Sequence, residues 1–196
     1  MKNVLLIVSI IIFNLSLFSQ QYDFRNTSWG ASLLQVKLSE KNKLAEETKQ
    51  KLVFADSLLN INCDVIYEFT NEDKLYNAKY SFDAKLTNYN KYIETYNSLK
   101  ELLVKKYGIF ISDKNTWLNN VKNQNDEELW GQEVAKGNLI IKTTWSFPNK
   151  NPYLNISVLL KKEDNGDGIL FQIEYVYMPI KKQDEANKLN DVLKSL

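Results

Sequence analysis

Five segments of this chain alternate apolar and polar residues with a period of two, which is typical of strands that bury one face and expose the other. Turn-forming stretches such as Asn71-Glu72-Asp73-Lys74 separate neighbouring segments. Short turns between such strands predict antiparallel meanders, because parallel strands need long crossover connections. The segments are Cys63 to Phe69, Tyr76 to Phe82, Leu139 to Phe147, Leu154 to Leu160 and Ile169 to Tyr177. A sixth, short strand is predicted before them at Leu52-Val53-Phe54.

Helical periodicity occurs outside these segments. Across residues 88–107 apolar positions recur at steps of three and four, and Gly108 follows as a helix stop. Ser32 and Gln35 have the spacing of a capping box at the start of a short helix. Residues 181–196 predict a closing helix. The apolar side of the short helix is supplied by Leu33, Leu34, Val36 and Leu38, and that of the closing helix, expected to face inward, by Ala186, Leu189, Val192 and Leu193.

In chain order the predicted elements are helix, three strands, helix, variable loop, three strands and helix, with the loop expected from Ser112 to Asn125. Helices covering one face of an antiparallel sheet would bury the apolar strand faces, so we expect an α+β fold. The order suggests two similar halves, residues 21–86 and 87–196, within a single domain of residues 21–196. Trp29-Gly30 and Trp130-Gly131 stand near the starts of the halves and favour a duplication weakly.

The first twenty residues have the composition of a secretory signal peptide. Lys2 provides the positive start, an apolar run extends from Val4 to Phe13, and Ser16 to Gln20 is polar enough for a cleavage region. We therefore expect a periplasmic or secreted protein with no membrane insertion after signal removal. The only cysteine is Cys63, which rules out both a lipidated N-terminal cysteine after the leader and an internal disulfide.

The charge balance argues against a nucleic-acid partner. The chain has 25 Lys and Arg against 24 Asp and Glu, and loss of the leader removes Lys2 and no acid, which leaves 24 against 24. Nucleic-acid binding needs a basic excess gathered on one face, and a neutral chain lacks that excess.

The residue types exclude most catalytic machinery. The chain has no histidine, so neither a Ser-His-Asp or Cys-His arrangement nor a histidine-based zinc site can form. The glycine-rich motifs of nucleotide enzymes are also absent. We expect no cofactor, no metal and no enzymatic activity, although a carboxylate-pair hydrolase stays open. Glu68 and Glu174 are interpreted as single solvated acids on outward strand faces, and the loop from Asp164 to Gly168 as a hairpin turn rather than a calcium site.

Most aromatic residues fall at positions where strand or helix periodicity assigns them to the core, and Cys63 shares a strand face with apolar residues. Trp117 and Trp130 are the exceptions, because the first lies in the expected polar loop and the second beside a glycine. We predict these two tryptophans as binding residues.

Two short motifs resemble known proteins. The stretch from Phe24-Arg25 through Trp29-Gly30, Ser32 and Val36, with the run from Leu103 to Gly108, resembles a family of uncharacterised exported bacterial proteins. The same helix start, followed by Tyr67-Glu68-Phe69 and Leu75, looks more distantly like the α+β modules of outer-membrane assembly lipoproteins and of the β-lactamase inhibitor protein. The resemblance implies a protein-binding role and carries over no functional residue.

The leading hypothesis is thus an exported, non-enzymatic domain that binds another envelope protein through its sheet face or through the loop from Ser112 to Asn125. The alternative is a binder of a small apolar or carbohydrate ligand in an aromatic-lined pocket between helices and sheet.

Overall fold

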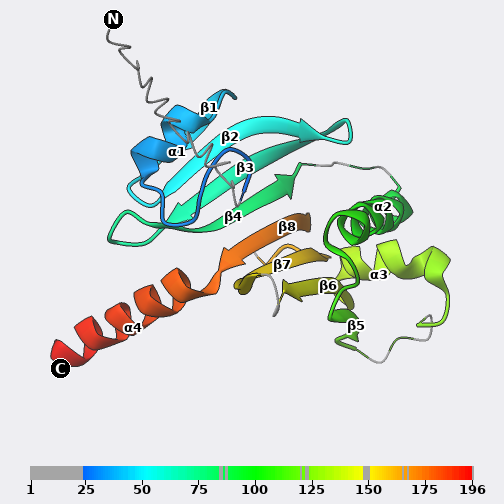
Figure 1. The fold of residues 1–196 in the computed structure, drawn as a ribbon. Coiled ribbons are helices and arrows are strands. Elements are labelled where there is room, and N and C mark those ends of the chain that lie inside the picture. The colour runs from blue at the N-terminus through cyan, green and yellow to red at the C-terminus, as the bar shows by residue number, and fades with distance from the viewer. Residues whose placement is uncertain are drawn as a thin grey trace, which may run out of the picture.

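The computed structural model describes residues 24–83, 86, 88–119, 121, 124–147, 151–164, 166 and 168–195. The expected leader, residues 1–20, lies outside this part of the chain. Within it, eight strands form one antiparallel sheet in the order β1-β2-β3-β4-β8-β7-β6-β5 (Figure 1). The predicted α+β class with antiparallel meanders is confirmed.

The strands are β1 (Leu44–Glu47), β2 (Lys51–Leu58), β3 (Ile61–Phe69), β4 (Leu75–Phe82), β5 (Ser112–Trp117), β6 (Leu139–Phe147), β7 (Asn151–Lys162) and β8 (Ile169–Tyr177). The helices are α1 (Leu33–Ser39), α2 (Asn90–Tyr107), α3 (Trp130–Lys136) and α4 (Met178–Lys194), with a 3₁₀ turn η1 (Glu127–Leu129) before α3.

The strand order is symmetrical about the central β4–β8 pair, in which Lys79 lies opposite Glu174. Each side contributes four strands rather than the expected three, because β1 and β5 form the two edges of the sheet. The prediction of a loop at Ser112 was therefore wrong for β5. This strand is too polar to show a period of two, since as an edge strand it has little apolar surface to bury. The two Trp-Gly pairs are not equivalent: Trp29 precedes α1, whereas Trp130 begins α3.

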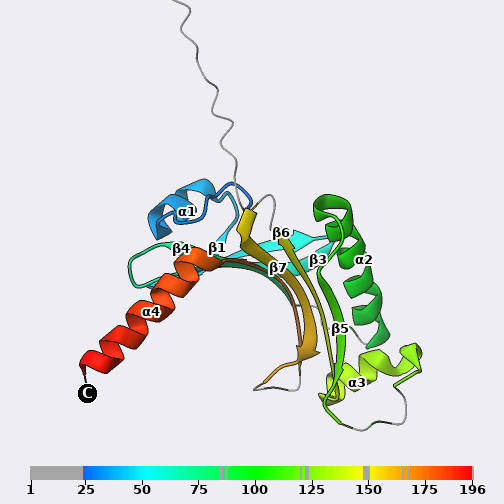
Figure 2. The same cartoon turned by 60° about the horizontal axis from the view of Figure 1, so that its bottom comes forward.

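One face of the sheet carries the core. The register aligns buried or apolar residues across it, with Tyr67 opposite Ala78 and Ile156 opposite Trp145. α1, α2 and α3 all pack on this face and bury Val36, Tyr96 and Val134 respectively. Figure 2 shows the sheet as a bent arc with these helices on its convex side. In the described part of the chain, no helix covers the other, concave face in this way.

α2 and α3 approach each other at Gly131, a buried glycine in the first turn of α3. A Cβ built at this position would lie 2.3 Å from the backbone oxygen of Tyr89. Only glycine fits there, because real Cβ atoms do not come so close to a backbone atom. The glycine thereby sets how closely the two helices pack.

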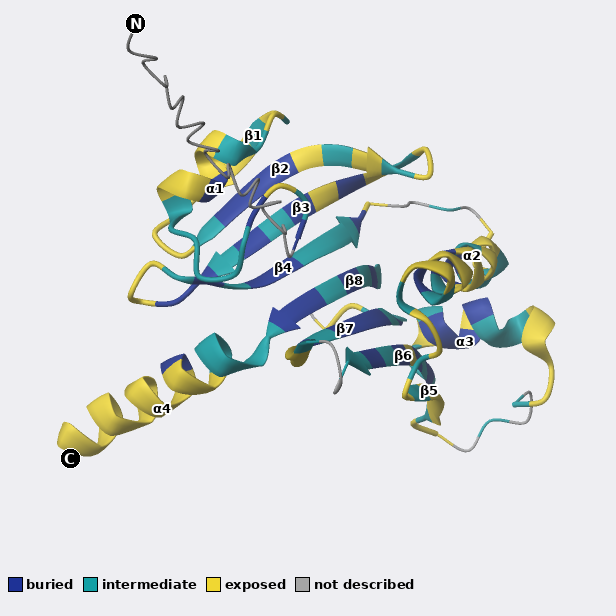
Figure 3. Cartoon of the chain, in the orientation of Figure 1, coloured by how far each residue is buried: buried dark blue, intermediate teal, exposed yellow. Residues whose placement is uncertain are grey.

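α4 does not close the core. It extends away from the sheet, and its last turns are exposed over their whole circumference (Figure 3). The prediction that Ala186, Leu189, Val192 and Leu193 face inward was wrong; the last three are 60%, 56% and 58% exposed. α1 also differs in part from its predicted apolar side: Val36 is buried, but Leu34 and Leu38 face solvent. In the described part of the chain, every helix is too short or too polar to cross a bilayer.

Candidate functional site

Among the described residues, the helices α1, α2 and α3 leave the concave face of the sheet uncovered (Figure 2). One continuous row across it, taken from the strand register, consists of Ile66, Lys79, Glu174, Ser157, Thr144 and Ser112. The parallel row beside it consists of Asp64, Ser81, Gln172, Leu159, Lys142 and Lys114. Hydroxyls, amides and charges of both signs therefore dominate this face, which we call the open face. Such a surface can form many hydrogen bonds with another protein.

A polar cluster lies near the middle of the open face. The Asn77 Nδ2 donates to Glu174 Oε1 at 2.8 Å and to Glu68 Oε2 at 3.1 Å. Lys79 Nζ lies 2.6 Å from the other Glu68 oxygen. The interpretation of Glu68 and Glu174 as single acids was therefore wrong, because strand register brings both to one amide. Lys79 neutralises one of the two charges, as expected of a structural cluster.

α4 borders the open face at its base. Burial raises the pKa of Tyr76, and the negative charges of Glu68 and Asp184 raise it further. Asp184, in α4, is itself buried and forms an ion pair with Lys188 at 2.6 Å. Asn187 Nδ2 donates to Glu72 in the β3–β4 turn at 3.1 Å. The first half of α4 is thus fixed against the sheet, and the second half continues beyond it.

Trp117 and Trp130, the predicted binding residues, lie against each other. Their ring centroids are 6.4 Å apart with an interplanar angle of 76°, an edge-to-face contact. Trp117 ends β5 opposite Leu139, and Trp130 Nε1 donates to the backbone oxygen of Gln124 at 3.1 Å. Both rings are half-buried and pack on the core cluster. They lie on the convex side of the sheet, away from the open face.

A hollow of about 120 Å³ adjoins Trp130 between α2 and β5. A chain of hydrogen bonds crosses its wall: Tyr96 and Thr143 share one at 2.6 Å, Thr143 donates to Asp113 at 2.6 Å, and Lys100 lies 3.0 Å from Asp113. These polar groups already pair with one another. Their pairing explains the hollow as a polar junction between helix and sheet.

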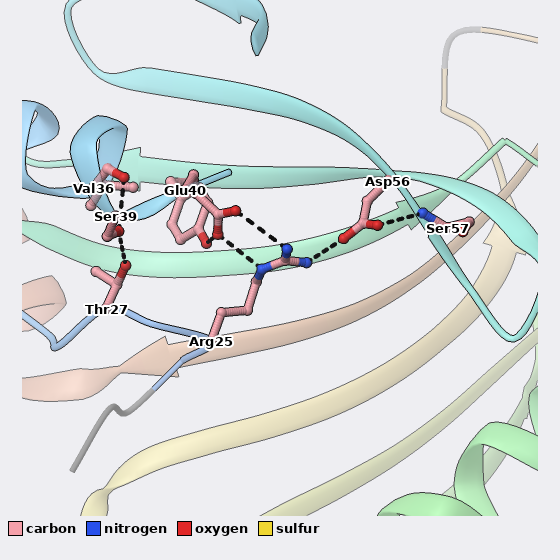
Figure 4. A network of polar contacts seen from close by, with 8 residues as sticks. Arg25, Thr27, Val36, Ser39, Glu40, Asp56 and Ser57 are labelled. Atoms are coloured by element: carbon pink, nitrogen blue, oxygen red, sulfur yellow. Dashed lines mark hydrogen bonds and ion pairs between the residues drawn. The ribbon is translucent and has the colours of Figure 1, made fainter. Parts of the chain in front are cut away.

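Arg25 is the centre of a second polar network, on the convex side (Figure 4). Its guanidinium contacts Asp56 and lies 2.9 Å from Glu40, and Tyr67 donates its hydroxyl proton to the same Glu40. Burial, the largest single effect, would raise the pKa of Asp56, but the hydrogen bond and charge of Arg25 together with the backbone hydrogen bond from Ser57 outweigh it and lower that pKa. Burial and the contact with Glu40 raise the pKa of Tyr67 far above its ordinary range. The network fixes the segment around Arg25 to the core.

In the described part of the chain, Cys63 is a poor candidate nucleophile, and the acidic residues form no candidate metal site. Cys63 is 3% exposed, and burial together with the charge of Asp56 raises the pKa of its thiol to about 11. Such a thiol stays protonated and unreactive at neutral pH. Across the same residues no group of three acids or cysteines could hold a metal ion. In the loop predicted as a turn, Asp164 pairs with Lys161 at 2.7 Å, while Asn165 and Asp167 lie outside the described residues.

A search of protein-family models, of curated proteins and of solved structures finds no match to this chain. The sequence reasoning also missed Asn77 and the exposed tip of α4 as surface features. A signal for Asn77 existed, because an amide directly opposite Glu68 in a hairpin is positioned to pair with it.

Proposed function

We propose that this chain is an exported, non-enzymatic domain that binds another protein of the cell envelope through the open face of its sheet. The observation that supports this most is the uncovered concave face of a continuous sheet, bordered by α4. Antiparallel sheets often leave one face to solvent, but the bend makes this face a rigid concave surface.

The chemistry of the open face favours a protein partner over other macromolecules. Lys79 and Glu174 stand directly opposite each other. Lys142 and Lys114 pair across β6 and β5 at one end of the second row, and Asp64 on β3 lies at its other end. The charges are mixed and the leader-free chain is neutral, so a polyanion gains little here. The leader sequence and the likeness to protein-binding modules support an envelope partner.

α4 adds an apolar element to this polar surface. Leu189, Val192 and Leu193 are all more than half exposed on one protruding helix. Protein interfaces combine a polar rim with a few buried apolar anchors, and an exposed helical stripe can provide those anchors. The proposed interface therefore joins the open face to the tip of α4.

Site-specific photo-crosslinking in living cells tests the proposal. A photoreactive residue placed at Lys142 on the open face, or at Val192 on α4, is expected to give the same adduct. The control position is Lys91 on α2, whose side chain is 58% exposed on the convex side. Adducts of equal yield at all three positions, or none at the first two, would count against the open face.

Paired substitutions extend the test. The change Leu189→Glu with Leu193→Glu is expected to abolish the adduct at Lys142 by charging the apolar stripe. The matched control changes Leu34 and Leu38 of α1 to Glu, since both leucines are at least as exposed as Leu189 and Leu193 but lie on the other side of the sheet. Loss of the adduct in both double variants would contradict a role for α4.

A further inference from the structure

The helices leave one part of the convex face open, at the seam where β4 meets β8. α1 covers the strands on one side of this seam, and α2 and α3 cover those on the other (Figure 2). Between them lies a hollow of about 170 Å³. Tyr80 and Ile173 line it from the sheet, and Leu99 and Leu102 from α2. We call this hollow the seam pocket.

The seam pocket has an apolar body and a single charge at its edge. Among the described residues, its lining consists of leucine, isoleucine and tyrosine side chains with Lys106 as the only charged residue. Lys106 Nζ lies 4.9 Å from the centre of the Tyr107 ring, and no carboxylate among the described residues lies within ion-pair distance of it. This cation is therefore available to a negative group at the mouth of the pocket.

The dimensions limit what the seam pocket can hold. An apolar protein cavity of about 150 Å³ stays dry and takes up a ligand as small as benzene. The seam pocket is of similar volume, which suits one short hydrocarbon segment and excludes a larger ring system. Leu102 is 43% exposed at the opening, so a ligand can enter without unfolding α2.

We infer that the seam pocket binds a small anionic amphiphile, a medium-chain carboxylate whose hydrocarbon chain enters between α2 and the sheet and whose carboxylate pairs with Lys106. The argument combines apolar walls, a matching volume and, at one edge, a cation that has no carboxylate partner among the described residues. The site lies on the convex side of the sheet, so it is independent of the proposed protein-binding face.

Calorimetric titration of the full leader-free chain with sodium octanoate, below its micelle concentration, tests the inference. Neutral 1-octanol is the companion probe. The change Lys106→Gln is expected to weaken octanoate binding about fivefold, the effect of a solvent-exposed ion pair, and to leave octanol binding unchanged. Lys105→Gln is the matched control, because Lys105 neighbours Lys106 on α2 but does not line the pocket.

A second variant tests the apolar part of the site. The change Leu102→Glu places a charge at the mouth and is expected to reduce binding of both probes more than tenfold. Leu38→Glu, at a leucine 77% exposed on α1, is its control. Circular dichroism shows whether each variant remains folded. The inference is overturned if octanoate fails to bind, if folded Leu102→Glu binds it as the parent does, or if Lys106→Gln and Lys105→Gln behave alike.

Discussion

Arg25 and Glu40 form an ion pair inside the protein: Arg25 Nε lies 2.9 Å from Glu40 Oε1, and the Glu40 side chain is 1% exposed. Arg25 adopts a left-handed backbone conformation, with φ of 50°, in the tight turn closed by the hydrogen bonds between Phe24 and Thr27. A non-glycine residue holds such a conformation only when its surroundings compensate for the strain. The ion pairs of Arg25 with Glu40 and with Asp56 hold its side chain in place in this turn.

Removal of the guanidinium is expected to destabilise the fold strongly. Arg25→Met leaves the buried Glu40 carboxylate without its cation, which costs about 3 kcal/mol in the free energy of unfolding. Urea denaturation measures this. The double variant Arg25→Met with Glu40→Gln removes both charges of the pair, keeps an acceptor for the Tyr67 hydroxyl, and is expected to recover part of the loss. A double variant less stable than Arg25→Met alone would contradict the buried-charge explanation.

Glu133 is expected to make stability depend on pH. Hydrogen bonds from Lys136 and Asn138 hold the pKa of this carboxyl below its ordinary value of 4.5. The unfolded chain therefore binds a proton at Glu133 more readily than the folded chain does. As a result, the free energy of unfolding decreases as the pH falls from about 4.5 through the lower pKa of the folded state. Glu133→Gln is expected to lose about 2 kcal/mol at pH 7 and to show a shallower fall in acid.

Unfolding free energies measured in urea from pH 7 to pH 3 check the role of Glu133. Glu94→Gln is the control, because Glu94 forms an exposed pair with Lys91 and is expected to change stability little. Equal acid slopes for Glu133→Gln and the parent protein would show that this carboxyl does not control the dependence.

Gly131 and Gly108 require glycine for different reasons: a close backbone contact at Gly131, and a positive φ at Gly108. Gly131→Ala would force a Cβ against the backbone of Tyr89, at a cost of about 2 kcal/mol or more as α2 and α3 move apart. Gly108 has nothing within 4 Å of a built Cβ, but its φ of 87° and ψ of −164° lie in a region essentially confined to glycine. Gly108→Ala therefore costs only the conformational strain, about 1 to 3 kcal/mol. Thermal unfolding compares the two. A smaller loss at Gly131 than at Gly108 would mean that α3 shifts freely.

Trp117 and Trp130 are expected to stabilise each other. A double-mutant cycle with Trp117→Leu and Trp130→Leu should give a coupling free energy of about 1 kcal/mol, typical of an edge-to-face aromatic pair. Urea denaturation of the two single variants and the double variant measures it. The pair Trp29→Leu and Trp130→Leu, whose rings lie in separate parts of the fold, is the control and should be additive. Additivity for Trp117 and Trp130 as well would mean that the contact contributes no stability.

The sheet could be predicted from sequence because its inner strands obey a strict alternation. Tyr67, Ile156 and Ile173 all face the core at the positions that a period of two assigns to them. β1 and β5 could not be predicted in this way, because an edge strand with one hydrogen-bonded neighbour can remain polar on both faces. The polar composition from Ser112 onward consequently resembled that of a loop.

The surface features were harder to predict than the core. The apolar residues of α4 have the helical spacing that normally indicates packing, yet Leu189 and Val192 face solvent. Periodicity identifies an amphipathic helix but does not say whether its partner belongs to the same chain. Likewise the Trp117–Trp130 contact depends on the pairing of β5 with β6, which sequence alone did not reveal.

Truncation of α4 tests whether its second half belongs to the folded core. A chain that ends after Lys188 keeps the Asp184–Lys188 ion pair and the contact of Asn187 with Glu72, and loses only the exposed turns. Its free energy of unfolding is expected to stay within about 0.5 kcal/mol of the parent value, because residues 189–195 are all exposed.

The contrasting variant changes the base of α4. Ile180 packs beside Gly30, where a built Cβ would lie 3.4 Å from Ile180 Cδ1. Ile180→Asp places a charge against this contact and is expected to cost about 2 kcal/mol in urea denaturation. A truncated chain that loses as much as Ile180→Asp would mean that the tip of α4 packs on the body in solution. The stripe of Leu189, Val192 and Leu193 would then no longer be free to contact a partner.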